Sequence, residues 1–241
     1  MPPTNSVKKA EAVIQSGLEK KREQSRRKIL DVAMELFYNK GYNETTTRDI
    51  ITKAGILNGS LYNRFNGKED ILRSIVAQAL NDALTASAKA LEEERNPIVS
   101  VVLPGAMELY AANYSKRAAE LLYEAHKSWP AVDEFVRIAQ EWATNYLSRY
   151  GLELSDTKNL HAKLLAIVGA LGNMVGYYAH GGQEEYRQYL DSLVSATAAM
   201  MHIPVLDLEK TVTKICTIVE DSGITICGYE LRGVCGDSMP Q

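Results

Sequence analysis

The polar and basic residues with a chemically suggestive spacing lie between residues 44 and 72. Thr46 and Asp49 are spaced like a capping box, which predicts a short helix over 47–54. A second short helix is predicted between Ile56 and Phe65. Two short helices joined by a glycine-containing turn are typical of a helix-turn-helix, whose second helix can enter a DNA major groove about 12 Å wide. The candidate DNA-contacting residues are Thr46, Thr47, Arg48, Asn58, Gly59, Ser60, Tyr62, Asn63 and Lys68.

On this segment the sequence resembles the TetR family of bacterial transcriptional regulators. The resemblance covers about residues 25–75, roughly a quarter of the chain. It implies a DNA-binding head followed by a helical body that binds a small molecule and dimerises. The residues that carry it are Thr45-Thr46-Thr47-Arg48-Asp49-Ile50, Ala54-Gly55-Ile56, Gly59-Ser60-Leu61-Tyr62, Phe65 and Lys68-Glu69-Asp70-Ile71-Leu72.

Roles for these residues follow from their chemistry and from the resemblance together. Tyr62 and Lys68 are expected on phosphates, as in the family, because Lys68 opens a helix beside free backbone N–H groups. The residues 46–48 are further backbone-contact candidates, and Asn58, Gly59, Ser60 and Asn63 lie where base edges are read. Taken singly, Tyr62 could simply pack, Lys68 could be a solvated charge and Asn58 could be a helix cap.

Two positions depart from the family's pattern. Leu57 stands where the family usually has a small polar residue that caps the second helix, and leucine cannot cap. Either Asn58 replaces it as the cap, or the helix starts differently, or Leu57 contacts a thymine methyl group. Ile51 also replaces a small residue. Both departures bear on the base-contact assignments rather than on the fold.

Charge is distributed unevenly along the chain. Residues 1–68 carry 13 Lys and Arg against 7 Asp and Glu, whereas the whole chain has a net charge of −3. A basic N-terminal quarter on an acidic remainder suggests a polyanion-binding head on a body with another role. A solvated basic helix is the alternative interpretation.

The pattern as a whole predicts an all-α protein with a three-helix head on a larger helical body. Residues 1–24 are predicted as a flexible basic arm or frayed helix, 25–72 as the DNA-binding domain, 73–221 as the effector-binding and dimerisation domain, and 222–241 as a glycine-rich tail with one short strand or hairpin as the alternative. Body helices are predicted near 97–114, 117–127, 131–149, 157–180, 184–202 and 206–220.

The body contains candidates for an effector site and for a dimer interface. Small-ligand sites are mostly apolar with a few polar anchors, although aromatic side chains at helical spacing are more often core residues. The effector candidates are Met107, Tyr110, Tyr114, His126, Trp129, Trp142, Met174, Tyr177 and Tyr178. Small residues at helical spacing allow close helix approach, either at a dimer interface or inside one subunit. The dimer candidates are Ala166, Gly169, Gly172 and Gly176.

Several classes of function find no support in the sequence. It has no phosphate-binding loop, no nucleophile elbow and no zinc-protease motif, so neither an enzyme nor a cofactor is expected. Cys216, Cys227 and Cys235 are too few and too widely spaced for a zinc site, and sparse cysteines suit a reducing cytoplasm. The sequence has no stretch of about 18 apolar residues, so no transmembrane helix is expected. The sequence thus predicts a cytoplasmic homodimer that represses transcription at a palindromic DNA operator until an unidentified small molecule releases it; an activator and an effector-independent DNA-binding protein are the alternatives.

Overall fold

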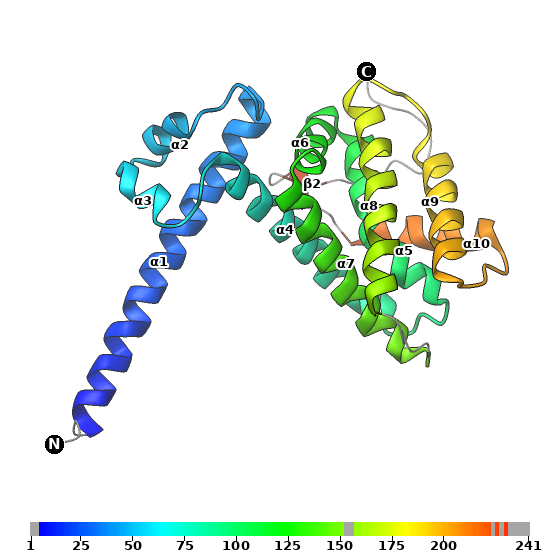
Figure 1. The fold of residues 1–241 in the computed structure, drawn as a ribbon, viewed down its shortest axis with the longest axis horizontal. Coiled ribbons are helices and arrows are strands. Elements are labelled where there is room, and N and C mark those ends of the chain that lie inside the picture. The colour runs from blue at the N-terminus through cyan, green and yellow to red at the C-terminus, as the bar shows by residue number, and fades with distance from the viewer. Residues whose placement is uncertain (1–4, 152–156, 223–224, 227–228, 231–241) are drawn as a thin grey trace. The chain divides into compact units, whose positions relative to one another are not determined.

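The computed structural model describes residues 5–151, 157–222, 225–226 and 229–230. These residues are almost entirely helical, with one pair of very short strands, which confirms the predicted fold class (Figure 1). The elements are α1 (Asn5–Lys40), α2 (Thr47–Ala54), α3 (Asn58–Tyr62), α4 (Lys68–Ser87), the 3-10 helix η1 (Ala88–Leu91), α5 (Pro97–Tyr114), α6 (Lys116–His126), α7 (Trp129–Arg149), α8 (Thr157–Ala179), α9 (Tyr186–Met201), α10 (Leu208–Asp221), β1 (Thr225–Ile226) and β2 (Tyr229–Glu230).

Near both ends of the chain, the described residues form regular structure where a flexible arm and a glycine-rich tail were the first expectations. The described part of the predicted basic arm, residues 5–24, is helical and continuous with the first helix of the head, so α1 begins far earlier than residue 25. In the tail, β1 and β2 pair antiparallel with Thr225 opposite Glu230, which is the hairpin alternative. Cys216 is buried, whereas Cys227 and Cys235 lie outside the described residues.

Backbone contacts divide the chain into two compact units, Met1–Ile71 and Leu72–Gln241, here called the head and the body. The predicted boundary after residue 72 lies next to this division. In the head, Ile29, Ile50 and Leu61 have no exposed surface, and Phe37 and Phe65 are almost fully buried. One residue from each of α1, α2 and α3 therefore meets in a single small core.

The body is built around α5, which contacts α6, α7, α8, α9 and α10. A helix that is apolar on all sides belongs in a core, and α5 is buried along most of its length. Pro104 inside α5 has no N–H, so the carbonyl of Ser100 lacks its usual helical donor. The indole Nε1 of Trp142 donates to that carbonyl at 2.7 Å, which fixes α7 against α5.

The small residues of α8, which were predicted to form a dimer interface or to pack inside one subunit, do not share one environment. A Cβ at Gly172 would lie 2.8 Å from the His126 ring, and one at Gly176 would lie 2.6 Å from the Tyr123 ring. Both glycines therefore let α6 of the same chain approach α8. A Cβ at Gly169 would meet no described atom within 4 Å apart from the adjacent backbone of α8 itself, and Ala166 is exposed.

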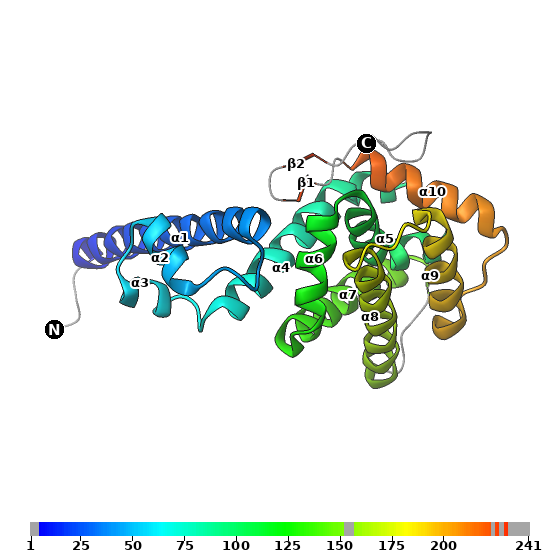
Figure 2. The same ribbon diagram turned by 90° about the horizontal axis from the view of Figure 1, so that it is seen from above.

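Within the described residues, α8 is also the helix with the composition of a membrane span. Asn159–Ala179 is long and apolar enough by length and hydropathy, a result that counting apolar runs did not anticipate, and 39% of it is buried inside the body. A core helix of a soluble protein passes the same test. Figures 1 and 2 show α8 and α9 side by side, and α8 also contacts α5, α6 and α7. Its apolar character is therefore accounted for in part by packing.

Candidate nucleic-acid interface and body cavity

The start of α2 is fixed by reciprocal capping. Thr46 Oγ1 accepts the Asp49 backbone N–H at 3.1 Å, and the Asp49 carboxylate accepts the Thr46 backbone N–H at 2.9 Å, as predicted. Lys40 Nζ also donates to that carboxylate at 2.8 Å. The Lys40 hydrogen bond, reinforced by those from Thr46, lowers the pKa of Asp49 to about 2. The Thr46 hydroxyl can still donate its own hydrogen to a phosphate while it accepts the capping bond.

Thr45 fixes the loop that leads into this capping box. Its hydroxyl donates to the Gly41 carbonyl at 2.8 Å, and the side chain is buried. Gly41 has a φ of 98°, a left-handed conformation that other residues rarely adopt. The turn after α1 therefore has a defined geometry, and α2 begins at a defined point.

Helix α3 is short, and buried residues at and just after its C-terminal end anchor it. Leu57 occupies the N-cap position without any side-chain cap, and it is 80% exposed. The helix therefore starts at Asn58 with no capping side chain, so Asn58 does not replace Leu57 as the cap. Buried Leu61 and Phe65 anchor it, so the face that carries Tyr62 remains available to a partner.

Two of the predicted phosphate-contacting side chains lie together. Tyr62 is 51% exposed, and its hydroxyl lies 3.4 Å from Oγ1 of Thr47, the first residue of α2. The structure therefore brings the end of α3 and the N-terminus of α2 onto one surface. The N-terminal N–H groups of α2 add a partial positive charge there.

Lys68 belongs to the same head but is tied to the loop before α2. Its Nζ donates to the Tyr42 carbonyl at 2.7 Å and lies 4.2 Å from the centre of the Tyr42 ring. The same Nζ also donates to the Asn43 carbonyl at 3.5 Å, so these contacts orient the charge beside the loop before α2. Sequence reasoning missed Tyr42 as this partner, because no local spacing links residues 42 and 68.

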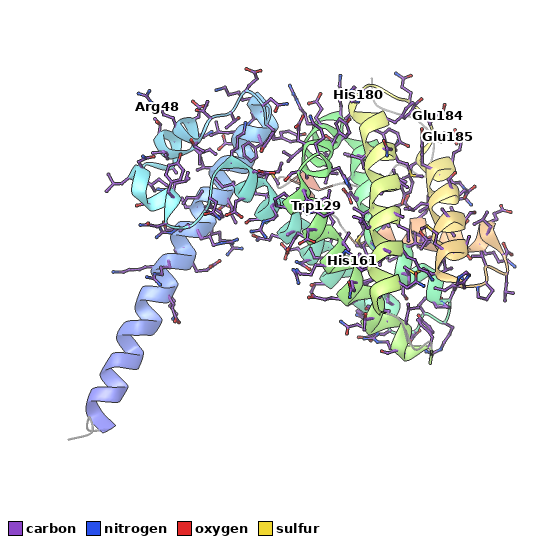
Figure 3. All side chains as sticks on the ribbon, viewed as in Figure 1. Arg48, Trp129, His161, His180, Glu184 and Glu185 are labelled. Carbon is purple, nitrogen blue, oxygen red and sulfur yellow. The ribbon has the colours of Figure 1, made fainter. Side chains whose placement is uncertain are left out.

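The other candidates in the head lie at its surface. Ser60 and Thr47 are half-buried, and Arg48 is labelled among the side chains of the head in Figure 3. The exposed ones are Thr46, Arg48, Asn58, Gly59 and Asn63.

In the body, the predicted effector residues lie in several different environments. Met107 and Tyr110 are buried core residues, and Tyr110 packs edge-on against Tyr186 with ring centres 5.4 Å apart. Trp129, labelled in Figure 3, is 64% exposed, and the indole N–H of Trp142 is used in the hydrogen bond to the Ser100 carbonyl. The remaining candidates are half-exposed Tyr114, exposed Tyr177, half-buried Met174, and buried His126 and Tyr178.

A narrow apolar cavity of about 40 Å³ lies elsewhere in the body, between α4, α5, α7, α8 and α9. Two polar residues open onto it, Glu108 and Thr197. Nε2 of His126 lies 2.6 Å from Oε1 of Glu108, and both side chains are buried. Thr197 is 2% exposed, and its hydroxyl has no hydrogen-bond partner among the described residues. The apolar part of the wall comprises Leu80, Val101, Val102, Pro104, Gly105, Phe135, Ala139, Leu164, Ile167, Val168, Leu171 and Leu193.

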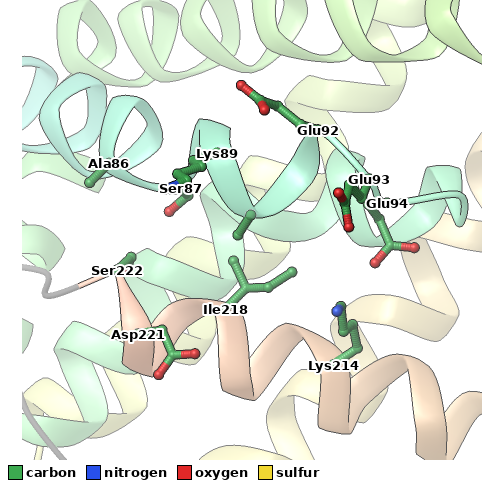
Figure 4. Close-up of a pocket in the computed structure, with 11 residues that line it drawn as sticks. Ala86, Ser87, Lys89, Glu92, Glu93, Glu94, Lys214, Ile218, Asp221 and Ser222 are labelled. Atoms are coloured by element: carbon green, nitrogen blue, oxygen red, sulfur yellow. The ribbon is translucent and has the colours of Figure 1, made fainter.

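A larger groove of about 630 Å³ lies between η1 and α10 (Figure 4). Glu92, Glu93, Glu94 and Asp221 line it together with Lys89 and Lys214. This wall contains six charged residues, whereas the narrow cavity has Glu108 as its one charged lining residue among those described. Ordinary small-molecule sites are predominantly apolar, so the narrow cavity is the better effector-site candidate.

Comparison with known proteins agrees with the geometry of the head. Residues 29–75 match the family described as "Bacterial regulatory proteins, tetR family", and this segment is a tetR-family domain. The chain is 46% identical over 57 residues to the HTH-type transcriptional repressor KstR2 of Rhodococcus jostii, which is 24% of this chain and 28% of that protein. It is 38% identical over 55 residues to the HTH-type transcriptional regulator SrpR of Pseudomonas putida, 23% of this chain and 26% of that one.

The matches to these curated relatives thus span little more than a quarter of their length. Among solved structures, the fatty acid degradation regulator FadR of Bacillus halodurans is similar at 15% identity with a TM-score of 0.45, covering 74% of this chain and 93% of that one.

Proposed function

We propose that this chain is a DNA-binding transcriptional regulator. The observation that carries the proposal is the surface on which Thr47 and Tyr62 meet, with Lys68 held in the same tetR-family domain. Tyr62, Lys68 and Arg48 bind phosphates, and Asn58 and Asn63 read base edges in the major groove. The curated relatives named as an HTH-type repressor and regulator support this role rather than an enzymatic one.

One pair of variants can distinguish the proposed phosphate contacts from the proposed base contacts. Lys68→Gln is expected to weaken binding to all DNA sequences and to flatten the dependence of affinity on salt by about 0.9 for each phosphate that is no longer neutralised. Asn63→Ala is expected to relax preference at one base position, at a cost of about 1–3 kcal/mol. Titration of both variants on selected and random duplexes at several salt concentrations measures this. Equal losses of affinity on both kinds of DNA for both variants would contradict the assignment.

The finer proposal is a cytoplasmic homodimer that represses at a palindromic operator. A two-fold dimer places two recognition helices about one helical turn apart on DNA. The exposed faces of α8 and α9 form the proposed interface, with Ala166, Gly169 and Ala170 on α8 and Ser195 and Ala199 on α9. Small side chains at this density let helices from two copies approach closely. A reporter fusion distinguishes repression from activation.

The dimer proposal predicts opposite behaviour for two neighbouring glycines. Gly169→Phe is expected to give a monomer in light scattering without lowering the free energy of unfolding, because a Cβ there meets no side chain of its own chain. The control Gly172→Phe is expected to lower that free energy, since the His126 ring occupies the space. A Gly169→Phe protein that remains dimeric would rule out this face.

The proposed effector site is the narrow cavity, in a closed form. A site for a small molecule usually holds about 300–1,000 Å³, so the effector must widen it. Helix α4 contributes Leu80 to the cavity wall and begins at Lys68. An effector that widens the cavity would therefore displace part of the same helix that carries a proposed DNA contact. Couplings between two such sites are typically about 1–3 kcal/mol.

The effector proposal predicts that Thr197→Val abolishes ligand binding while preserving the fold. Valine fills the same space without an unpaired hydroxyl, whose burial ordinarily costs about 1–3 kcal/mol, so stability should hold or rise. A thermal-shift screen with neutral hydroxyl-bearing aliphatic compounds checks this, with exposed Thr217→Val as the matched control. A ligand that stabilises the wild type and the Thr197→Val variant equally would show that it binds elsewhere.

A further inference from the structure

The N-terminal half of α1 lies outside the tetR-family match, which begins at residue 29. In Figures 1 and 2 this part of the helix continues beyond the ribbon of α2 and α3 within the head. The described side chains from Glu19 to Gln24 are all exposed. Neither the head core nor the helix-turn-helix explains why this helix continues.

The composition of this segment is unusual for a helix. Glu19–Lys28 reads EKKREQSRRK, with six basic residues, two acidic residues and no apolar residue. A helix that packs against a protein partner presents an apolar stripe, and this stretch has none. Its chemistry suits a polyanion rather than a second protein helix.

One contact links this basic segment to the end of the recognition helix. The Arg26 guanidinium lies 5.3 Å from the centre of the Phe65 ring, and Phe65 follows α3. The basic segment therefore starts beside the element proposed to read DNA and extends from there towards the N-terminus. Arg27 and Lys28 are also exposed.

The dimensions of the segment match those of a duplex. Ten helical residues are about 15 Å long at 1.5 Å per residue. B-DNA presents one negative charge per about 1.7 Å of its axis, so several phosphates fall within that length. The helical residues 5–28 together extend about 36 Å, close to one turn of DNA.

We propose that the segment Glu19–Lys28, here called the basic extension, binds the phosphates of DNA that flanks the sequence read by α3. This inference rests on the proposed DNA-binding function and adds a second, sequence-independent contact to it. Lys20, Lys21 and Arg22 supply the charges farthest from the head core. Neutralising them on phosphates also relieves the repulsion between Arg22 and Arg26, which lie at an i, i+4 spacing.

The test compares two duplexes and three proteins, all full length. The short duplex holds only the core site recovered by selection from random-sequence DNA, and the long one adds about 12 base pairs of unrelated sequence on each side, roughly one helical turn. The variant is Lys20→Gln/Lys21→Gln/Arg22→Gln, in which glutamine preserves helix propensity. The matched control removes the same charge from exposed sites of the body, as Lys89→Gln/Lys116→Gln/Lys210→Gln.

The wild type and the control are expected to bind the long duplex more tightly than the short one, and the variant is expected to lose this advantage. The salt slope of the variant on the long duplex should fall by about 0.9 for each phosphate left without a cation, while binding to the short duplex is retained. A variant that keeps both the length advantage and the slope overturns the inference. If the variant differs from the wild type in oligomeric state in a sedimentation experiment, the inference is overturned, and the basic extension instead mediates contact between two copies of the chain. If the wild type selects no site at all, the proposed function fails together with the inference.

Discussion

The head depends on one constraint: a helix of five residues is far too short to be stable in water by itself. Helix α3 exists because Leu61 and Phe65 are buried against α1 and α2, where Ile29 and Ile50 have no exposed surface. With its inner side committed to this core, α3 can present only its outer side to a partner. The absence of a capping side chain at Leu57 makes the helix more dependent on this packing.

The same core explains how the surface side chains obtain a defined arrangement. Thr45 and the Thr46–Asp49 capping box fix where α2 begins, and Lys40 ties the end of α1 to that box. Tyr62 then meets Thr47, and Lys68 is oriented by the Tyr42 carbonyl. Preorganised donors of this kind position a protein on phosphates without a large entropic cost at the moment of binding.

Sequence reasoning worked where the signals were local. Capping residues and terminal glycines gave α2 its bounds, Thr47–Ala54, and Pro97 with Asn96 marked the start of α5. It could not specify which face of a helix meets which neighbour. Gly172 and Gly176 have the spacing of an interface, yet that spacing serves α6 of the same chain equally well. The large aromatic residues predicted for the effector site fill the core or lie at the surface, and the narrow cavity is lined by Phe135 and by mostly aliphatic residues. Lys68 pairs with Tyr42, and Glu108 pairs with His126. Each pair joins different helices or loops, so no spacing along the sequence predicts it.

The central claim is that the surface around Tyr62 and Lys68 recognises DNA. Its most direct test is a binding selection from genomic fragments with the purified full-length protein, run beside a Tyr62→Ala/Lys68→Ala double variant of confirmed helicity. We predict that the wild type enriches a palindromic sequence and that the double variant loses it. Enrichment of the same sequence by both proteins, or of none by the wild type at moderate salt, would contradict the claim.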